Sequence, residues 1–197
     1  MSLLPLFFHV NHPLLPGYVS GNTPAGVSNF EPDTNVLAEA QRLTRSFSYK
    51  PRHGNNPPRP IHGLFLMGSL GTLAQADQSD MDMWVCHSPD LTESELAELR
   101  KKCQLLEAWA ANQGAEAHFF LIDPARFVRG ERDNQLSSEN CGTTQHYLRL
   151  DEFYRTAIWL AGRTPIWWLV PVYEESSYDR YTHTLLSKRF IRADESL

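Results

Sequence analysis

The order of apolar runs between residues 61 and 122 constrains the fold of this chain more than any other feature. The run at 61–67, IHGLFLM, ends at Gly68 and has the profile of a buried strand closed by a turn. The segments 79–87, SDMDMWVCH, and 115–122, AEAHFFLI, follow as a second and a third strand. A helical segment lies between these two strands, and the order is typical of an α/β fold.

The helix expected between the second and third strands is the clearest in the chain and covers 91–114. Thr92 and Glu95 have the spacing of a capping box, and Gly114 supplies a C-terminal stop. Apolar side chains recur every three or four residues and form one stripe, made of Leu96, Leu99, Cys103, Leu106 and Ala110. The pattern predicts that this stripe packs on the sheet.

The first sixty residues have a different composition and a different expected structure from the rest of the chain. Residues 1–35 are rich in proline and glycine, so we expect an irregular arm there without long regular elements. A short helix is predicted over 36–47, and a proline-rich, exposed linker over 48–60. We therefore divide the chain into this arm, 1–60, and a core, 61–197, within one structural domain.

The C-terminal part carries a second strong helical pattern. This helix is expected to begin near Thr143 or Thr144 and to end at Gly162, and 165–172, PIWWLVPV, forms a final short apolar element. Trp167 and Trp168 in that element could stack on a purine base, but core packing is the preferred interpretation.

Two aspartates alternate at the start of the second predicted strand. Because strand side chains repeat every two residues, Asp80, Asp82 and Trp84 share one face, while Met83 and Val85 share the other. Carboxylate oxygens suit hard divalent cations, so the pair predicts Mg²⁺ or Mn²⁺ with substrate phosphates completing the shell. The alternative is a pair of surface aspartates on an edge strand.

The turn before these aspartates has the features of an anion site. Gly68 lets the backbone approach a ligand closely, and a short helix that starts at Ser69 would present unpaired N–H groups to a phosphate. A polyphosphate held at this turn could place its reacting phosphorus beside the metals. The turn and the aspartates would then serve one ligand.

Composition limits the partners and the compartment. A net charge of -5 and a pI near 5.9 argue against nucleic acid held by bulk phosphate neutralisation. The three cysteines form no disulfide framework, which indicates a reducing compartment, and we expect the cytoplasm. No segment reads as a membrane span. Cys86 with His87, and Cys141 with His146, lack the spacing of a zinc site.

Four motifs resemble one family in the same order along the chain. They are HPLLPGYVSGNTPAGV, MGSLGTLAQADQSDMDMWVCH, LLEAWAANQGAEAHFFLIDPARF and CGTTQHYLRLDEFYRTAIWLAGR. Between about residues 5 and 185 the chain resembles the N-terminal domain of bacterial class I adenylate cyclases, which belong to the DNA polymerase beta superfamily of nucleotidyltransferases. The resemblance implies an α/β (α+β) nucleotidyltransferase-like mixed sheet with flanking helices and an irregular N-terminal arm.

The resemblance also implies a reaction and residues for it. ATP would be converted to 3′,5′-cyclic AMP and diphosphate by attack of the ribose 3′-oxygen on the α-phosphorus. Asp80 and Asp82 correspond to the metal ligands of the family. The substrate-binding positions of its motif correspond to Gly68, Ser69, Ser79 and Trp84.

The superfamily usually has a third carboxylate on the strand after the intervening helix. Glu116 and Asp123 are the candidates, and strand parity favours Glu116, which shares a face with His118. Glu116 would be a third metal ligand or the acceptor of the 3′-hydroxyl proton. The alternative is an exposed glutamate at a strand edge.

Arginine is the expected partner of the triphosphate, because the chain has few lysines. Relatives carry lysine after the sequence LAG, where this chain has Arg163, so the positive charge is retained with a different geometry. The alternative is an arginine that satisfies the last carbonyls of a helix.

Two other functions fit the same residues. One is a nucleotidyltransferase that passes a nucleotide to an external hydroxyl, and the other is a nucleotide-binding or regulatory domain without turnover. Family members are several times longer, so we expect a fragment of a longer chain, with a regulatory C-terminal region or a regulatory protein partner absent from this one.

Overall fold

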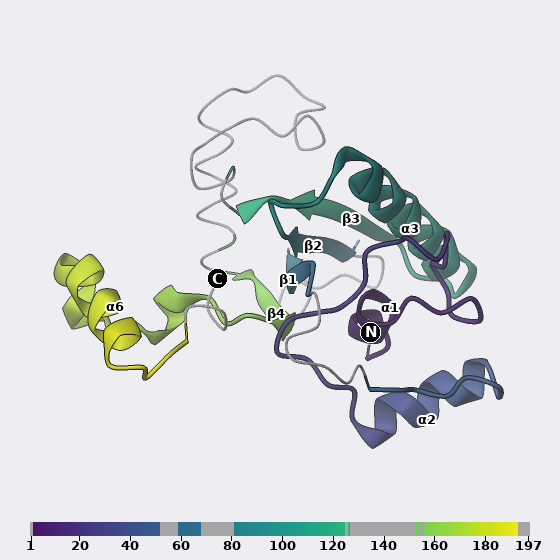
Figure 1. The fold of residues 1–197 in the computed structure, drawn as a ribbon, viewed down its shortest axis with the longest axis horizontal. Coiled ribbons are helices and arrows are strands. Elements are labelled where there is room, and N and C mark those ends of the chain that lie inside the picture. The colour runs from purple at the N-terminus through teal and green to yellow at the C-terminus, as the bar shows by residue number, and fades with distance from the viewer. Residues whose placement is uncertain are drawn as a thin grey trace.

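A four-stranded mixed sheet forms the centre of the protein in a computed structural model, which describes residues 2–51, 59–67, 81–124, 126, 153 and 156–192. The strands are β1 (Ile61–Met67), β2 (Met81–His87), β3 (Ala117–Ile122) and β4 (Ile158–Gly162), in the order β3-β2-β1-β4. β2 and β3 are parallel, and both other pairs are antiparallel. The predicted α/β (α+β) class, with a mixed sheet and flanking helices, is confirmed (Figure 1).

Each face of the sheet has its own apolar cluster. Met83 and Val85 on β2 belong to the larger cluster, whereas Trp84 and Cys86 belong to the smaller one on the opposite face. This division is the one that strand alternation predicted for β2. Asp82 therefore lies on the side of the smaller cluster.

Helix α3 (Glu93–Asn112) covers the face with the larger cluster. It begins with the predicted capping box, in which the Thr92 hydroxyl accepts the Glu95 N–H and the Glu95 carboxylate accepts the Thr92 N–H. Gly114 follows its end with a φ of +78°, a conformation that favours glycine. The predicted start and stop of this helix are thus confirmed. Leu99, Cys103, Leu106 and Ala110 of the predicted stripe are buried in the larger cluster, whereas Leu96 is half-buried and lies outside it.

Lys102 is a buried side chain of α3 that periodicity did not predict. It is almost fully buried, and its ammonium donates to the Gly17 carbonyl oxygen at 3.4 Å. Desolvation lowers the pKa of Lys102 to about 8. Lys102 thereby joins α3 to the turn at Gly17.

The N-terminal arm contributes the centre of the larger cluster. Helix α1 (Leu4–His9) inserts Phe7 and Phe8, both without solvent exposure, between the sheet and α3. The ring of Phe7 meets Trp109 edge-on at 5.2 Å, and that of Phe8 lies 5.7 Å from Phe119. Among the described residues of the arm the longest regular element spans ten residues, and the arm shares one core with the sheet.

A second helix of the arm, α2 (Thr34–Leu43), begins and ends earlier than the predicted 36–47. Asp33 sets its start, because the carboxylate accepts the N–H groups of Asn35 and Val36. Most of the proline-rich linker, 52–58, lies outside the described residues.

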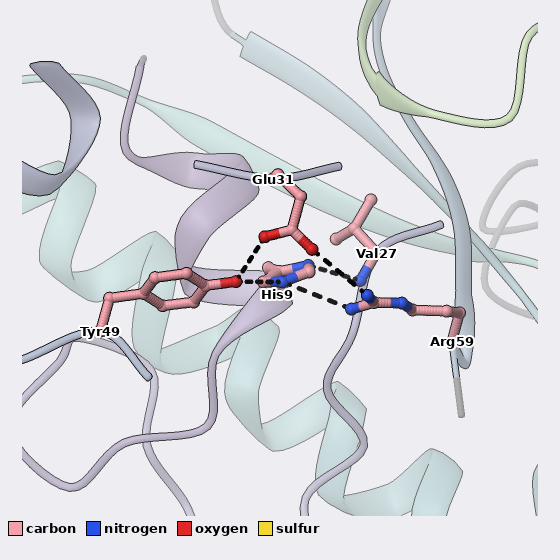
Figure 2. A network of polar contacts seen from close by, with 5 residues as sticks. All are labelled: His9, Val27, Glu31, Tyr49 and Arg59. Carbon is pink, nitrogen blue, oxygen red and sulfur yellow. Dashed lines mark hydrogen bonds and ion pairs between the residues drawn. The ribbon is translucent and has the colours of Figure 1, made fainter. Parts of the chain in front are cut away.

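Polar contacts fasten the arm to the entrance of β1 (Figure 2). His9 is buried, and its Nδ1 accepts the Val27 N–H at 3.2 Å, so the neutral ring carries its proton on Nε2. That nitrogen lies 3.3 Å from the Tyr49 hydroxyl, which donates to Glu31 at 2.8 Å. Glu31 also pairs with Arg59, two residues before β1, at 3.5 Å.

The prediction of a helix that ends at Gly162 is wrong for its last turns. Residues 158–162 form β4, which pairs with β1, and of the three residues described between 143 and 157, Phe153 and Thr156 are helical. Gly162, read as a helix stop, has a φ of +107°, and a Cβ there would collide with the His62 carbonyl oxygen. Gly162 instead allows the backbones of β4 and β1 to approach each other closely.

The chain after β4 extends away from the sheet (Figure 1). It forms the short helices η1 (Ile166–Leu169) and η2 (Val172–Ser177) and then α6 (Tyr178–Ser187). Val172, Tyr173 and Phe190 are 87%, 82% and 73% exposed. No helix in the described part of the chain is long and apolar enough to cross a membrane.

Candidate active site

The first residues of β2 and β3 form the candidate site, because the two strands are parallel and begin at the same edge of the sheet. Asp82 is half-buried, and its Cα partners are Met67 at the end of β1 and His118 on β3. Side chains of paired residues project from the same face. Asp82 and His118 are therefore neighbours on the face of the smaller cluster.

Glu116 lies beside the start of β2. Its carbonyl oxygen accepts the Met81 N–H at 2.9 Å, and its exposed carboxylate lies 3.5 Å from Nε2 of His118. Glu116 directly precedes β3 and lies two residues before His118, so alternation along the extended chain places it on the face of Asp82. The structure thus brings two predicted carboxylates to one edge of the sheet.

Asp123, the other candidate for the third carboxylate, lies at the opposite end of β3. Seven residues separate it from Glu116 along an extended chain, which corresponds to roughly 20 Å. Its carboxylate accepts the Arg126 N–H at 3.2 Å, as in a tight turn. Asp123 is therefore remote from Asp82, and Glu116 is the candidate that the fold favours.

Oxygen ligands at this edge suit a hard divalent cation. Asp82 and Glu116 supply carboxylates, which Mg²⁺ and Mn²⁺ prefer. Within the described ranges, no group of three His, Cys, Asp or Glu side chains is placed to hold a metal ion. Asp80, the second aspartate of the predicted pair, lies outside those ranges, as do Gly68, Ser69 and Ser79.

Trp84 lies two residues after Asp82 on β2 and therefore on the same face of the sheet. It is only 5% exposed, and its ring stacks on Phe153 with centroids 5.0 Å apart and an interplanar angle of 8°. Trp167 packs edge-on against Phe153 at 5.5 Å. Both tryptophans thus contribute to the smaller cluster, and the role of Trp84 in substrate binding stays a prediction.

Arg163, predicted to bind phosphate, lies at the other end of the sheet. It follows β4, and its backbone N–H donates to the His62 carbonyl oxygen at 2.7 Å. His62 is five residues along β1 from Met67, the partner of Asp82, which corresponds to roughly 17 Å. The structure does not bring Arg163 next to Asp82, and no helix ends at Arg163 for it to cap.

Cys86 lies in an apolar environment. Its side chain is buried in the smaller cluster, and desolvation raises the pKa of the thiol to about 12.

His62 is a titratable residue that the sequence patterns did not single out. It occupies an irregularity of β1, where the register with β2 shifts between Ile61 and Gly63. Burial lowers the pKa of His62 to about 4, with further lowering by the positive charges of Arg163 and His87. The ring is therefore neutral in the folded protein at pH 7.

This shift predicts an acid sensitivity of the fold. Between pH 6.5 and about 4 the unfolded chain binds a proton at His62 that the folded chain does not, so the free energy of unfolding falls as the pH decreases. His62→Gln should flatten this dependence, measured by urea unfolding at pH 7 and pH 4.5. The matched control is His183→Gln on α6, where the exposed ring should leave the dependence unchanged. Equal slopes for wild type and His62→Gln would contradict the prediction.

Comparison with known proteins gives one consistent result. The family model described as the adenylate cyclase NT domain matches residues 1–168. Proteins named adenylate cyclase from Proteus mirabilis, Salmonella typhimurium and Escherichia coli strain K12 are 43%, 45% and 45% identical over the whole of this chain. The chain spans 23% of the length of each of these relatives. No solved structure matches.

Proposed function

The chain belongs to the family of adenylate cyclase N-terminal domains, and from this premise we propose that it converts ATP to 3′,5′-cyclic AMP and diphosphate. Family membership is the observation that carries the proposal, because the similarity covers the whole chain. The placement of Asp82 and Glu116 at one edge of the sheet supports it. The enzyme would be a phosphorus–oxygen lyase.

The reaction requires one new bond and one broken bond. The ribose 3′-oxygen attacks the α-phosphorus of the same molecule, the bond from that phosphorus to the β-phosphate oxygen breaks, and diphosphate leaves with the electron pair. The 3′-hydroxyl loses its proton, and Glu116 would accept that proton or serve as a third metal ligand. Mg²⁺ or Mn²⁺, when held by Asp80 and Asp82, would stabilise negative charge on the attacking and leaving oxygens.

Binding of the triphosphate is assigned to the segment 68–80, which connects β1 and β2 and lies outside the described residues. Gly68 and Ser69 would supply backbone and hydroxyl donors to the phosphates, and Ser79 would support the start of β2. Trp84 anchors the strand that carries Asp82 through its stack on Phe153. Arg163 lies at the other end of the sheet from Asp82. Its predicted binding of the triphosphate would require the phosphates to span that distance.

Two alternatives need the same residues. A nucleotidyltransferase would pass the nucleotide to an external hydroxyl, and a binding or regulatory domain would hold ATP without turnover. Incubation with ATP or GTP, with Mg²⁺ or Mn²⁺, followed by nucleotide product analysis distinguishes them. Cyclic AMP without an added acceptor supports the proposal. ATP binding with no cyclic AMP at high protein concentration contradicts it and favours the binding domain.

Regulation and location are further parts of the proposal. Because the relatives are about four times as long as this chain, a C-terminal regulatory region or a regulatory protein would act on the catalytic domain. We assign the domain to the cytoplasm, in keeping with Cys86 and Cys103, which are buried free thiols.

A further inference from the structure

A groove runs along the outer edge of β3, next to the candidate active site. It has a volume of about 510 Å³, within the usual range for small-ligand sites. Polar side chains in its wall come from Glu107, Glu116 and His118. Small residues form the rest and leave room for a flat ligand: Ala108, Ala111, Gly114, Ala115 and Ala117.

The groove is one strand away from the reacting end of the proposed substrate. His118, in its wall, is the Cα partner of Asp82, and neighbouring strands are about 5 Å apart. Because α3 covers the opposite face of the sheet from Asp82 and β3 is the outermost strand, a nucleotide with its α-phosphate at Asp82 would extend its ribose and base around the outer edge of β3 to reach the groove. Glu116 and His118 lie along that path.

Glu107 is the wall residue with a fixed orientation. It reaches from α3 to β3, where its Oε1 accepts the Phe119 N–H at 2.9 Å. This bond holds the half-buried carboxylate at the groove and leaves Oε2 as a second acceptor. Within the described part of the chain, Oε2 has no other hydrogen-bond donor.

We propose that this groove is the purine subsite and that Oε2 of Glu107 accepts a hydrogen bond from the exocyclic amino group of adenine. The inference rests on the proposed function and deepens it. Adenine presents a donor at its C6 position, whereas guanine and hypoxanthine present a carbonyl acceptor. A carboxylate therefore favours adenine, because two facing acceptors leave both groups without a hydrogen bond.

The test exploits the geometry of Glu107→Gln. The amide oxygen of glutamine keeps the bond to the Phe119 N–H, so its NH₂ group takes the place of Oε2 and presents a donor. Binding is measured by calorimetry with 3′-deoxyATP and 3′-deoxyITP, which lack the attacking oxygen and cannot cyclise. We expect Glu107→Gln to lower the preference for the adenine nucleotide by at least about tenfold, the effect of one hydrogen bond to a charged group.

Glu98→Gln is the matched control on the same helix. The Glu98 carboxylate accepts the hydroxyls of Ser20 and Thr23, away from the groove, so this variant should keep the wild-type preference. If Glu107 only covers the edge of β3, its variant changes the melting temperature but not the preference. An unchanged preference in Glu107→Gln, or no nucleotide binding at all, overturns the purine subsite.

Turnover of ATP, followed in parallel, separates this inference from the proposed function. A shifted preference without cyclic AMP from the wild type supports the subsite and contradicts the cyclase reaction. Cyclic AMP formation with an unchanged preference supports the reaction and contradicts the subsite.

Discussion

Asp82→Asn is expected to abolish the formation of cyclic AMP while the protein stays folded. Asparagine is nearly isosteric with aspartate, but its neutral amide is a poor ligand for a hard divalent cation. The side chain lies at the start of β2 and is only half-buried, so the sheet and both apolar clusters do not depend on its charge. We expect the turnover rate with ATP and Mg²⁺ to fall by at least about a thousandfold, as for the removal of a central electrostatic group.

Asp90→Asn is the matched control. Asp90 lies beyond the opposite end of β2, where its exposed carboxylate accepts the Ser88 hydroxyl, and the variant should retain full activity. Circular dichroism and the melting temperature report whether each variant is folded. Substantial activity in folded Asp82→Asn would remove this residue from the mechanism.

Phe8→Ala is expected to cause a large loss of stability. The ring is fully buried between the sheet and α3, so its removal loses apolar burial and leaves a cavity. We expect the free energy of unfolding to decrease by about 3–5 kcal/mol. That loss is a large part of the 5–15 kcal/mol typical of a whole domain.

Urea unfolding followed by tryptophan fluorescence measures this effect. Leu14→Ala in the same arm is the control, because its side chain is 47% exposed and its loss should cost less than about 1 kcal/mol. A similar, small change in both variants would show that the arm is not part of the core.

Local patterns were sufficient to predict the central elements. The apolar run at 61–67 coincides with β1, and the capping box of Thr92 and Glu95 marks the start of α3. These signals lie within a few residues of the structure that they specify. The burial of α1 could not be predicted in this way, because proline and glycine density describes the backbone and not the distant residues that Phe7 and Phe8 contact.

The errors have the same physical origin. The end of the predicted helix at 158–162 is a strand because β1 offers an edge for pairing, and that edge lies far away in the sequence. The direction of β4 then places Arg163 beside His62 and away from Asp82. By contrast, strand parity predicted that Glu116 would share a face with His118, and the parallel pairing of β2 and β3 adds Asp82 to that face.

The sequence analysis did not identify Glu107, because its position in the helical pattern of α3 is the only local signal for this residue. It lies one position after Leu106 in the apolar stripe of α3, where a charged residue usually reads as solvated surface. Its hydrogen bond to Phe119 depends on how α3 packs against β3.

The position of α1 in the core has a consequence for how the chain is made. Phe7 and Phe8 leave the ribosome early, but their partners Trp109 and Phe119 are synthesised only after much of the chain has followed. Until then these aromatic side chains lack the partners that bury them in the folded protein. The core that contains α1 can therefore be completed only after β3 has been synthesised.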